Sequence, residues 1–286
     1  MLGAIVGDVI GSPFEFDWHR EEAHSKKFEL VSRRSYVTDD SIMTLAVADA
    51  LMKSMHKLGD PVDENKFRKQ LIASMQNFGR MYPNAGYGSR FRSWLREDNP
   101  QPYNSWGNGS AMRVSPIAWA FSTLDEVERY AEISAAVSHN HPEGIKGAQA
   151  AAGAVFLARM GKSKDDIREY ITTRYGYDLS RTLDDIRPNY WHVESCQETV
   201  PEAITAFLEG KDFEDVARCA VSLSGDSDTL TDISCAIAEA FYGIPEEICG
   251  MVESKLDDFM MNLLLKWELW RAKSFRDSLN MQKEEQ

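Results

Sequence analysis

Paired cysteines, an excess of basic residues and long hydrophobic runs are all missing from this sequence of 286 residues. The four cysteines form no CxxC pair and have no histidine at zinc-finger spacing, so we expect neither a disulfide framework nor a structural zinc site. The net charge is −13, which argues against sequence-independent binding to nucleic acid or to an anionic membrane surface. Asp8 interrupts the apolar N-terminus and no basic stretch precedes it, so we expect no signal peptide or membrane span there.

Long runs of alternating β-branched residues are also missing, whereas helical signals recur from end to end. The sequence therefore predicts an all-α protein. We find no internal repeat and no interdomain linker, so a single domain over residues 1–286 is expected, with only residues 282–286 frayed. The thiols and the absent leader favour a cytoplasmic location, and we expect a monomer.

Helix starts and stops can be assigned at several places. Gly3, Gly7 and Gly11 recur every four residues, which on a helix makes a stripe that another backbone can approach closely. Capping residues and apolar periodicity predict further helices. These begin after Thr38, Thr123 and Ser163, and cover residues 142–161, 201–210 and about 226–242. The segments 82–88 and 99–115 are expected to be irregular and, because they are rich in aromatics, ordered and functional.

Two predicted helices begin with acidic clusters that lie far apart in the sequence. Either cluster alone is explained by ordinary helix capping and the helix dipole. Brought together, the four carboxylates would repel one another unless a cation lay between them, and such oxygen ligands suit Mg²⁺, Mn²⁺ or Ca²⁺. The candidate ligands are Thr38, Asp39, Asp40, Asp226, Asp228 and Thr229.

Five short motifs, in a fixed order, connect these clusters to a known family. They are GDVIGS at 7–12, TDDS at 38–41, GNGSAMR at 107–113, SHNHPEG at 138–144 and SGDSDT at 224–229. In this order they resemble the ADP-ribosylglycohydrolases, which include the dinitrogenase reductase-activating glycohydrolase and the ADP-ribosyl-acceptor hydrolases. The resemblance covers nearly the whole chain.

The resemblance implies a compact orthogonal helical bundle with a central cleft that holds ADP-ribose and two divalent cations, Mg²⁺ or Mn²⁺. The six candidate ligands fall where the family places its metal ligands. Glu15, Asp39, Asp40 and Asp228 are implied as catalytic, although Glu15 alone also fits an ordinary surface carboxylate. The implied ADP-ribose-binding residues are Gly88, Ser105, Trp106, Asn108, Gly109 and His139.

The implied reaction is hydrolysis of the glycosidic bond at the distal ribose of an ADP-ribosylated acceptor, most simply arginine, with release of ADP-ribose. The alternatives are a non-catalytic ADP-ribose-binding module and a metal-dependent phosphoester hydrolase. Two positions depart from the family pattern. Ser224 stands where a glycine is common, and Asp232 adds a carboxylate one turn after Asp228, facing either the metal site or solvent.

Overall fold

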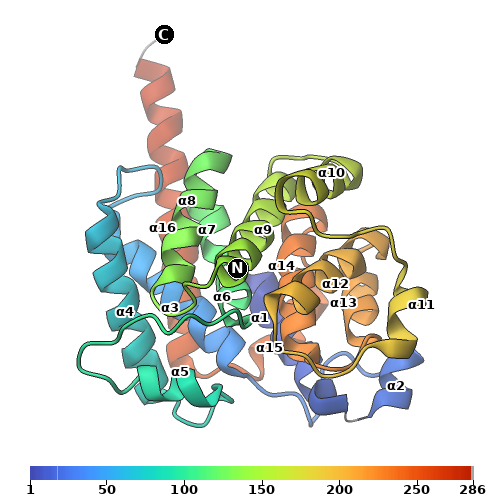
Figure 1. Ribbon diagram of the computed structural model, residues 1–286. Coiled ribbons are helices and arrows are strands. Elements are labelled where there is room, and N and C mark those ends of the chain that lie inside the picture. Colours follow the sequence, from blue (N-terminus) through green and yellow to red (C-terminus); the bar gives the residue numbers. More distant parts are fainter. Residues whose placement is uncertain (18, 285–286) are drawn as a thin grey trace.

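The computed structural model describes residues 1–17 and 19–284, with side chains for all of these except residues 17 and 273–284. Within the described residues the chain forms helices joined by loops and no β-strand, which confirms the all-α prediction (Figure 1). The helices are α1 (Leu2–Gly11), η1 (Ser12–Asp17), α2 (Arg20–His24), α3 (Asp39–Ser54), α4 (Glu64–Met81), α5 (Ser89–Trp94), α6 (Gly109–Met112), α7 (Ser115–Ala120), α8 (Leu124–Ala136), α9 (Pro142–Arg159), α10 (Lys164–Tyr175), α11 (Leu183–Ile186), η2 (Arg187–Asn189), α12 (Cys196–Glu209), α13 (Phe213–Val221), α14 (Ser227–Tyr242), α15 (Glu246–Glu253) and α16 (Asp258–Glu284).

Helices α1 and α14 are in direct backbone contact at the centre of the molecule. A Cβ atom added at Gly3 would lie 2.3 Å from the carbonyl oxygen of Cys235, and one at Gly7 would lie 2.2 Å from that of Thr231. At Gly11 the added atom would lie 2.6 Å from the Cα atom of Asp228. The glycine stripe therefore serves helix packing, as predicted, and it brings the end of α1 next to the start of α14.

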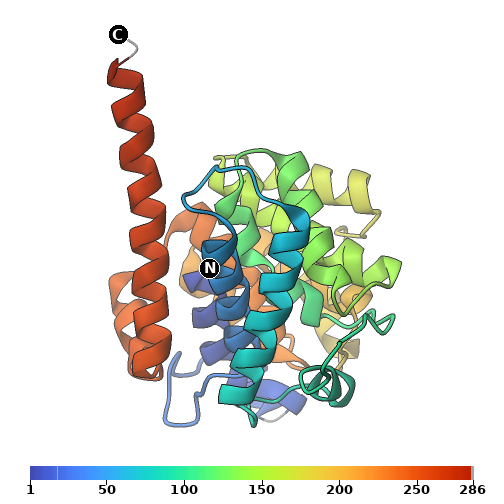
Figure 2. The same cartoon turned by 90° about the vertical axis from the view of Figure 1, so that its left-hand side faces the viewer.

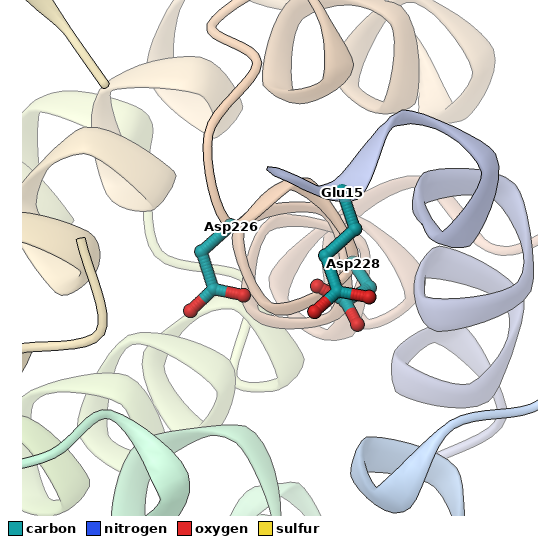
Figure 3. Close-up of side chains that lie close together, drawn as sticks. All are labelled: Glu15, Asp226 and Asp228. Atoms are coloured by element: carbon teal, nitrogen blue, oxygen red, sulfur yellow. The ribbon is translucent and has the colours of Figure 1, made fainter. Parts of the chain in front are cut away.

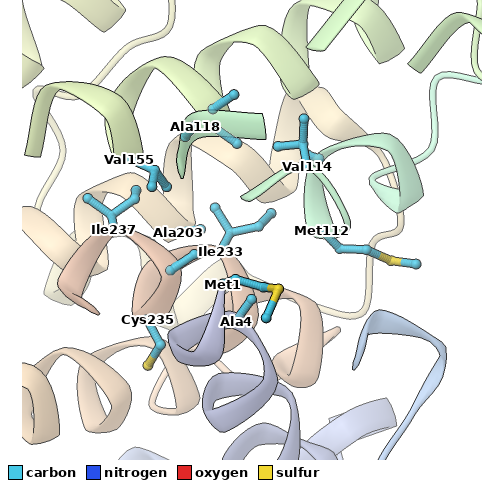
Figure 4. Close-up of a cluster of buried hydrophobic side chains, with 14 of the residues drawn as sticks. Met1, Ala4, Met112, Val114, Ala118, Val155, Ala203, Ile233, Cys235 and Ile237 are labelled. Carbon is cyan, nitrogen blue, oxygen red and sulfur yellow. The ribbon is translucent and has the colours of Figure 1, made fainter. Parts of the chain in front are cut away.

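The other helices surround this pair and share one apolar core. Figure 4 shows Ala4 of α1 and Ile233 of α14 beside Val155 of α9 and Ala203 of α12, all of them buried. Small residues at these crossings let the helices approach one another closely. Helices α3 and α4 pack on the opposite side of α1 from α12 and α13 (Figure 1).

Most predicted helix starts are confirmed. The Thr38 side chain accepts a hydrogen bond from the Asp40 N–H and begins α3. Thr123 forms a capping box at the start of α8, Ser163 does so at the start of α10, and Pro142 occupies the first position of α9. These local signals act through neighbouring backbone atoms, so they can be read without knowledge of the tertiary structure.

Two predicted boundaries are wrong. Helix α12 begins at Cys196, so Pro201 lies inside it. The start is fixed by a long-range contact, because the Cys196 N–H donates to the carbonyl oxygen of Trp106 at 2.9 Å. The segment 99–115, expected to be irregular, contains α6 and the start of α7.

Helix α16 lies along one side of the body, and its C-terminal end extends beyond it (Figure 2). Residues 282–284 of the expected frayed segment continue this helix, and residues 285–286 lie outside the described part of the chain. No helix among the described residues combines the length and the apolar character needed to cross a membrane.

Because α1 and α14 are in backbone contact, one methyl group added between them should reduce the stability of the protein. Gly7→Ala should lower the free energy of unfolding by about 1–3 kcal/mol, because the added Cβ collides with the α14 backbone. Gly250→Ala is the matched control: this helical glycine in α15 has no atom within 4 Å of an added Cβ. That variant should gain about 0.5–1 kcal/mol from helix propensity. Urea unfolding measures both changes, and equal stability of the two variants would contradict the proposed contact.

Candidate metal centre and ligand cavity

The two acidic helix starts meet at one cavity. Asp39 and Asp40 from α3, and Asp226 and Asp228 from α14, line a cavity of about 310 Å³. Glu15 of η1 lies with Asp226 and Asp228, and each of these three side chains has a carboxylate oxygen within 4.8 Å of the others (Figure 3). The carboxylates that the sequence placed in two separate clusters therefore share one site.

A tight turn places the α14 carboxylates. Ser224 and Gly225 have φ values of +62° and +74°, so two successive residues adopt the left-handed conformation before Asp226. Glycine adopts this conformation without steric cost and serine does not, which gives a physical reason for the glycine common at position 224 in the family. The Asn108 amide donates to Asp226 Oδ2 at 2.5 Å and fixes that carboxylate.

Asp8 holds the start of α3 and was not among the predicted site residues. Its carboxylate is fully buried and accepts hydrogen bonds from the Thr38 N–H at 3.0 Å, the Thr38 hydroxyl at 2.7 Å and the Ser41 N–H at 3.2 Å, and from the Ser41 hydroxyl. Helix α1 therefore positions the turn that carries Asp39 and Asp40. The signal in the sequence was a single carboxylate in an otherwise apolar, glycine-rich helix.

The carboxylates are held in an environment that disfavours their charge. Burial, followed by the charge of Asp228, raises the pKa of Asp39 and of Asp40 well above the usual value. Burial and the charge of Asp226 do the same for the pKa of Asp228, and burial raises the pKa of Asp226 to about 6. Within the described residues, Oδ2 of Asp40 is buried without a hydrogen-bond partner.

This arrangement fits a bound divalent cation. Buried carboxylates that repel one another, with an unpaired oxygen among them, become favourable once positive charge lies between them. The donors are hard oxygens without a thiolate or an imidazole in the cluster, which is the set that Mg²⁺, Mn²⁺ or Ca²⁺ prefers over Zn²⁺. A cluster of acidic residues suited to a metal is thus present, as the sequence predicts.

Glu15 lines the cavity and is half-buried. Burial, together with the nearby charge of Asp228, raises its pKa to about 8. The adjacent Phe16 has a φ of +57°, a strained conformation that breaks the helical turn at this point. The geometry therefore differs from that of an ordinary surface carboxylate, because Glu15 faces the acidic cluster.

The loop from Tyr103 to Gly109 forms another wall of the same cavity. Ser105, Asn108, Gly109 and His139 all line it, as does Gly88 from the loop before α5. The Ser105 hydroxyl accepts from the Gly107 N–H at 3.1 Å, which tightens the loop. The predicted binding residues are thus largely brought together beside the predicted metal ligands.

Arg113 also lines this cavity and supports the loop, and it was not predicted as a functional residue. Its guanidinium is completely buried and donates to the Gly109 carbonyl at 2.9 Å and to the Ser138 hydroxyl at 3.0 Å. Ser138 in turn contacts His139 Nδ1 at 2.8 Å. Burial and the charge of Arg113 hold the pKa of His139 well below its usual value, so the imidazole is neutral at physiological pH.

Three of the residues singled out in the sequence lie elsewhere. Thr38 is buried beneath the cavity, with its hydroxyl bonded to Asp8, and does not line the cavity wall. Trp106 is 51% exposed and packs edge-on against His141 outside the cavity lining, so it is not a core residue. Asp232 is completely buried, so its expected alternative of facing solvent is wrong, and neither of its oxygens has a partner within the described residues.

The sequence matches the ADP-ribosylglycohydrolase family over residues 1–273. The chain belongs to this family. Members of the ADP-ribosylglycohydrolase family hydrolyse ADP-ribosyl linkages, and this chain is a hydrolase of that class. The resemblance inferred from the five motifs is thereby confirmed.

Known ADP-ribosylglycohydrolase relatives cover most of the chain. ADP-ribosylhydrolase ARH3 of Homo sapiens is 26% identical and covers 86% of this chain and 85% of its own length. ADP-ribosylarginine hydrolase Tri1 of Pseudomonas putida is 25% identical, over 85% of this chain and 70% of its own length. A solved structure of an ADP-ribosylglycohydrolase-related protein complex superimposes with a TM-score of 0.68 and 22% identity, covering 96% of this chain and 95% of that one, which supports the fold.

The raised pKa values predict that stability depends on pH and on metal. Protonated carboxyls are favoured in the folded state, so the metal-free protein should lose stability as the pH rises from about 4, near the ordinary carboxyl pKa, to about 8. This range ends at the raised pKa values, about 6 for Asp226 and about 8 for Glu15. Added Mg²⁺ should restore stability most strongly at the upper end of this range, where the carboxylates are ionised. Thermal melting with Mg²⁺ and with EDTA measures this. Melting temperatures that do not respond to Mg²⁺ at pH about 8.5 would contradict the metal site.

Asp8→Asn should disrupt the start of α3 without adding or removing a side chain in the cavity wall. The amide cannot accept the same set of hydrogen bonds, so donors of Thr38 and Ser41 lose partners in a buried place. We expect a loss of about 1–3 kcal/mol of stability and at least about tenfold weaker metal binding. Ser93→Ala, an exposed position on α5, is the control. Wild-type metal affinity in Asp8→Asn, measured by calorimetry, would refute the positioning role.

Proposed function

We propose that this protein uses divalent cations, Mg²⁺ or Mn²⁺, to hydrolyse the glycosidic bond between ADP-ribose and a modified arginine, releasing intact ADP-ribose. The observation that carries the proposal is a single cavity in which four carboxylates from two helix starts and Glu15 face the Ser105–Gly109 loop and His139. One wall suits cations and the other suits a polar, phosphate-bearing ligand.

The acidic wall would hold the cations. Asp39, Asp40, Asp226 and Asp228 supply carboxylate oxygens, and the Thr229 hydroxyl completes the proposed ligand set in the cavity. Thr38, whose hydroxyl is bonded to Asp8, would support this set from outside the lining. When bound, a pair of divalent cations would orient the ribose hydroxyls and lower the pKa of a water molecule. The Asn108 amide fixes Asp226 at the start of α14, and the Asp8 carboxylate fixes the start of α3. These two bonds hold the two acidic helix starts in place.

Glu15 is placed to act at the anomeric carbon. Glycosidic hydrolysis develops positive charge on the sugar ring, and a carboxylate beside the ring stabilises that charge. With its pKa raised to about 8, Glu15 can also hold a proton at neutral pH and exchange it during the reaction. Asp228 lies close enough to influence both the charge and the position of this side chain.

The opposite wall would bind the ADP portion. Gly88, Ser105, Asn108 and Gly109 allow close approach of a diphosphate, and the Gly109 N–H opens α6 without an acceptor in its own helix. Neutral His139 can donate or accept a hydrogen bond there, and Trp106 on the adjacent rim offers an exposed ring face for adenine. Binding of this remote portion would orient the distal ribose at the cations.

Arginine is the proposed acceptor on two grounds. The relative from Pseudomonas putida carries the name ADP-ribosylarginine hydrolase. The net charge of −13, with Glu15 and Glu194 at the cavity, favours a cationic guanidinium over a neutral acceptor. We further propose that the whole chain acts as one domain, as a monomer, on an ADP-ribosylated protein in the cytoplasm, where its four free thiols are stable.

Product analysis tests the proposed function. The protein is incubated with an arginine-ADP-ribosylated and with a serine-ADP-ribosylated peptide, each with Mg²⁺ and with EDTA, and the products are identified by mass spectrometry. We expect Mg²⁺-dependent release of intact ADP-ribose from the arginine peptide. Release of AMP would indicate a phosphoester hydrolase instead. Binding without release would indicate a module that only binds ADP-ribose.

Glu15→Gln should reduce kcat by about 10²-fold or more while the affinity for ADP-ribose stays near the wild-type value. The amide has the same shape but cannot carry the charge or the exchangeable proton. Glu169→Gln is the control, because Glu169 is an exposed glutamate on α10 that does not line the cavity. An unchanged kcat in Glu15→Gln would remove Glu15 from the mechanism.

A further inference from the structure

A second cavity lies next to the first, between the end of α4 and helix α5. Its volume is about 220 Å³. Figure 1 shows α5 near the lower end of α4, at the edge of the bundle. Residues 82–88, which include Tyr87, join the two helices. Gly79 and Leu95 form part of the lining, together with three arginines, Arg80, Arg92 and Arg96.

The three arginines are not neutralised by the protein. Residues 80–96 contain four arginines and no aspartate or glutamate, in a chain whose net charge is −13. Among the described residues the three guanidinium groups form no ion pair. Arg80 donates to the Asn77 amide oxygen at 3.3 Å and Arg92 to the Tyr87 carbonyl at 3.1 Å, both of them neutral acceptors. All three arginines are exposed, so water screens much of their mutual repulsion, and a bound anion would offset the part that remains.

The residues that line this cavity in the described part of the chain include no carboxylate. The C-terminal end of α4 carries the equivalent of about half a negative charge, and Arg80 in its last turn already balances it. Two further guanidinium groups remain. Their planar forks match the oxygens of phosphate, which they bind with paired hydrogen bonds.

A buried hydroxyl adds a second feature that points to a ligand. Tyr87 lines this cavity and is 2% exposed, yet its hydroxyl has no hydrogen-bond partner among the described residues. The next residue, Gly88, lines the proposed ADP-ribose cavity. The charge of Asp39 also acts on Tyr87 and helps to raise its pKa. One short loop therefore separates the two cavities.

We propose that Arg80, Arg92 and Arg96, with Tyr87, form a phosphate-binding site that is separate from the proposed catalytic cavity. Its ligand is a phosphate group, supplied either by a free phosphate compound or by a phosphate on the acceptor portion of the substrate. A bound phosphate would contact both Arg80 at the end of α4 and Arg92 of α5, and so would stabilise the loop that carries Gly88.

Titration with inorganic phosphate tests the site. Calorimetry is carried out on the full chain in EDTA, with saturating ADP-ribose and at constant ionic strength, since screening changes exposed charges. Wild type should show a phosphate-binding step. Arg96→Ala should weaken it by about tenfold and Arg92→Ala/Arg96→Ala should abolish it, because charged hydrogen bonds are lost.

Arg33→Ala is the matched control, since Arg33 is an exposed arginine outside both cavities. It should bind phosphate like the wild type. Unchanged melting temperatures and ADP-ribose affinities in all variants show that the fold and the first cavity are intact. The same phosphate affinity in the double variant as in wild type, or no phosphate binding in wild type, would overturn the proposal.

Kinetics then distinguish the two sources of phosphate. For a substrate with a phosphorylated acceptor, inorganic phosphate should raise KM in wild type but not in Arg92→Ala/Arg96→Ala, if the site holds the acceptor. For a free effector, phosphate should change kcat or melting temperature alone. Because binding is measured without turnover, failure of the proposed hydrolase activity would leave this test intact.

Discussion

The close contact between α1 and α14 is the constraint on which the site depends. Glycines at positions 3, 7 and 11 remove every side chain between the two backbones, and the end of α1 meets the first turn of α14. Asp8 then lies beside the contact and accepts hydrogen bonds from the start of α3. This one helix crossing thus brings together the end of α1, the start of α3 and the start of α14, although α1 and α14 are more than 200 residues apart in the sequence.

That crossing collects negative charge in a place where water cannot compensate for it. Burial and mutual repulsion raise the pKa values of Asp39, Asp40 and Asp228. The charge of His192 acts on Glu15 and Asp226, whose pKa values are nevertheless raised. The uncharged amide of Asn108 and the backbone N–H groups orient the carboxylates without neutralising them. A cation bound between these carboxylates would reduce their mutual repulsion and so stabilise the fold, which couples metal binding to stability.

The sequence was most informative where chemistry is local. Caps at Thr38, Thr123 and Ser163 act through adjacent backbone atoms and could be placed correctly. The start of α12 could not, because it is fixed by a contact with Trp106, some ninety residues earlier. The family motifs predicted which residues would share the cavity. The supporting roles of Asp8 and Arg113 became visible only once the helices were packed, since their hydrogen bonds join segments remote in sequence.

Trp106 and Asp232 show what sequence reasoning leaves open. Both could be singled out from the sequence, but their roles depend on exposure, which follows from packing. Trp106 is exposed and Asp232 is wholly buried. The loop from residue 82 to residue 88 shows the same limit. Its aromatic residues predicted order, while its position between two cavities follows from the arrangement of α4 and α5.

The most direct test of the account is a crystal structure of the protein soaked in Mn²⁺, with data collected at the manganese absorption edge. Two anomalous peaks about 3.5–4 Å apart, between the carboxylates of Asp39 and Asp40 on one side and of Asp226 and Asp228 on the other, are predicted. Anomalous peaks only elsewhere, or an ordered cluster without manganese, would contradict the claim that these two helix starts form one metal centre.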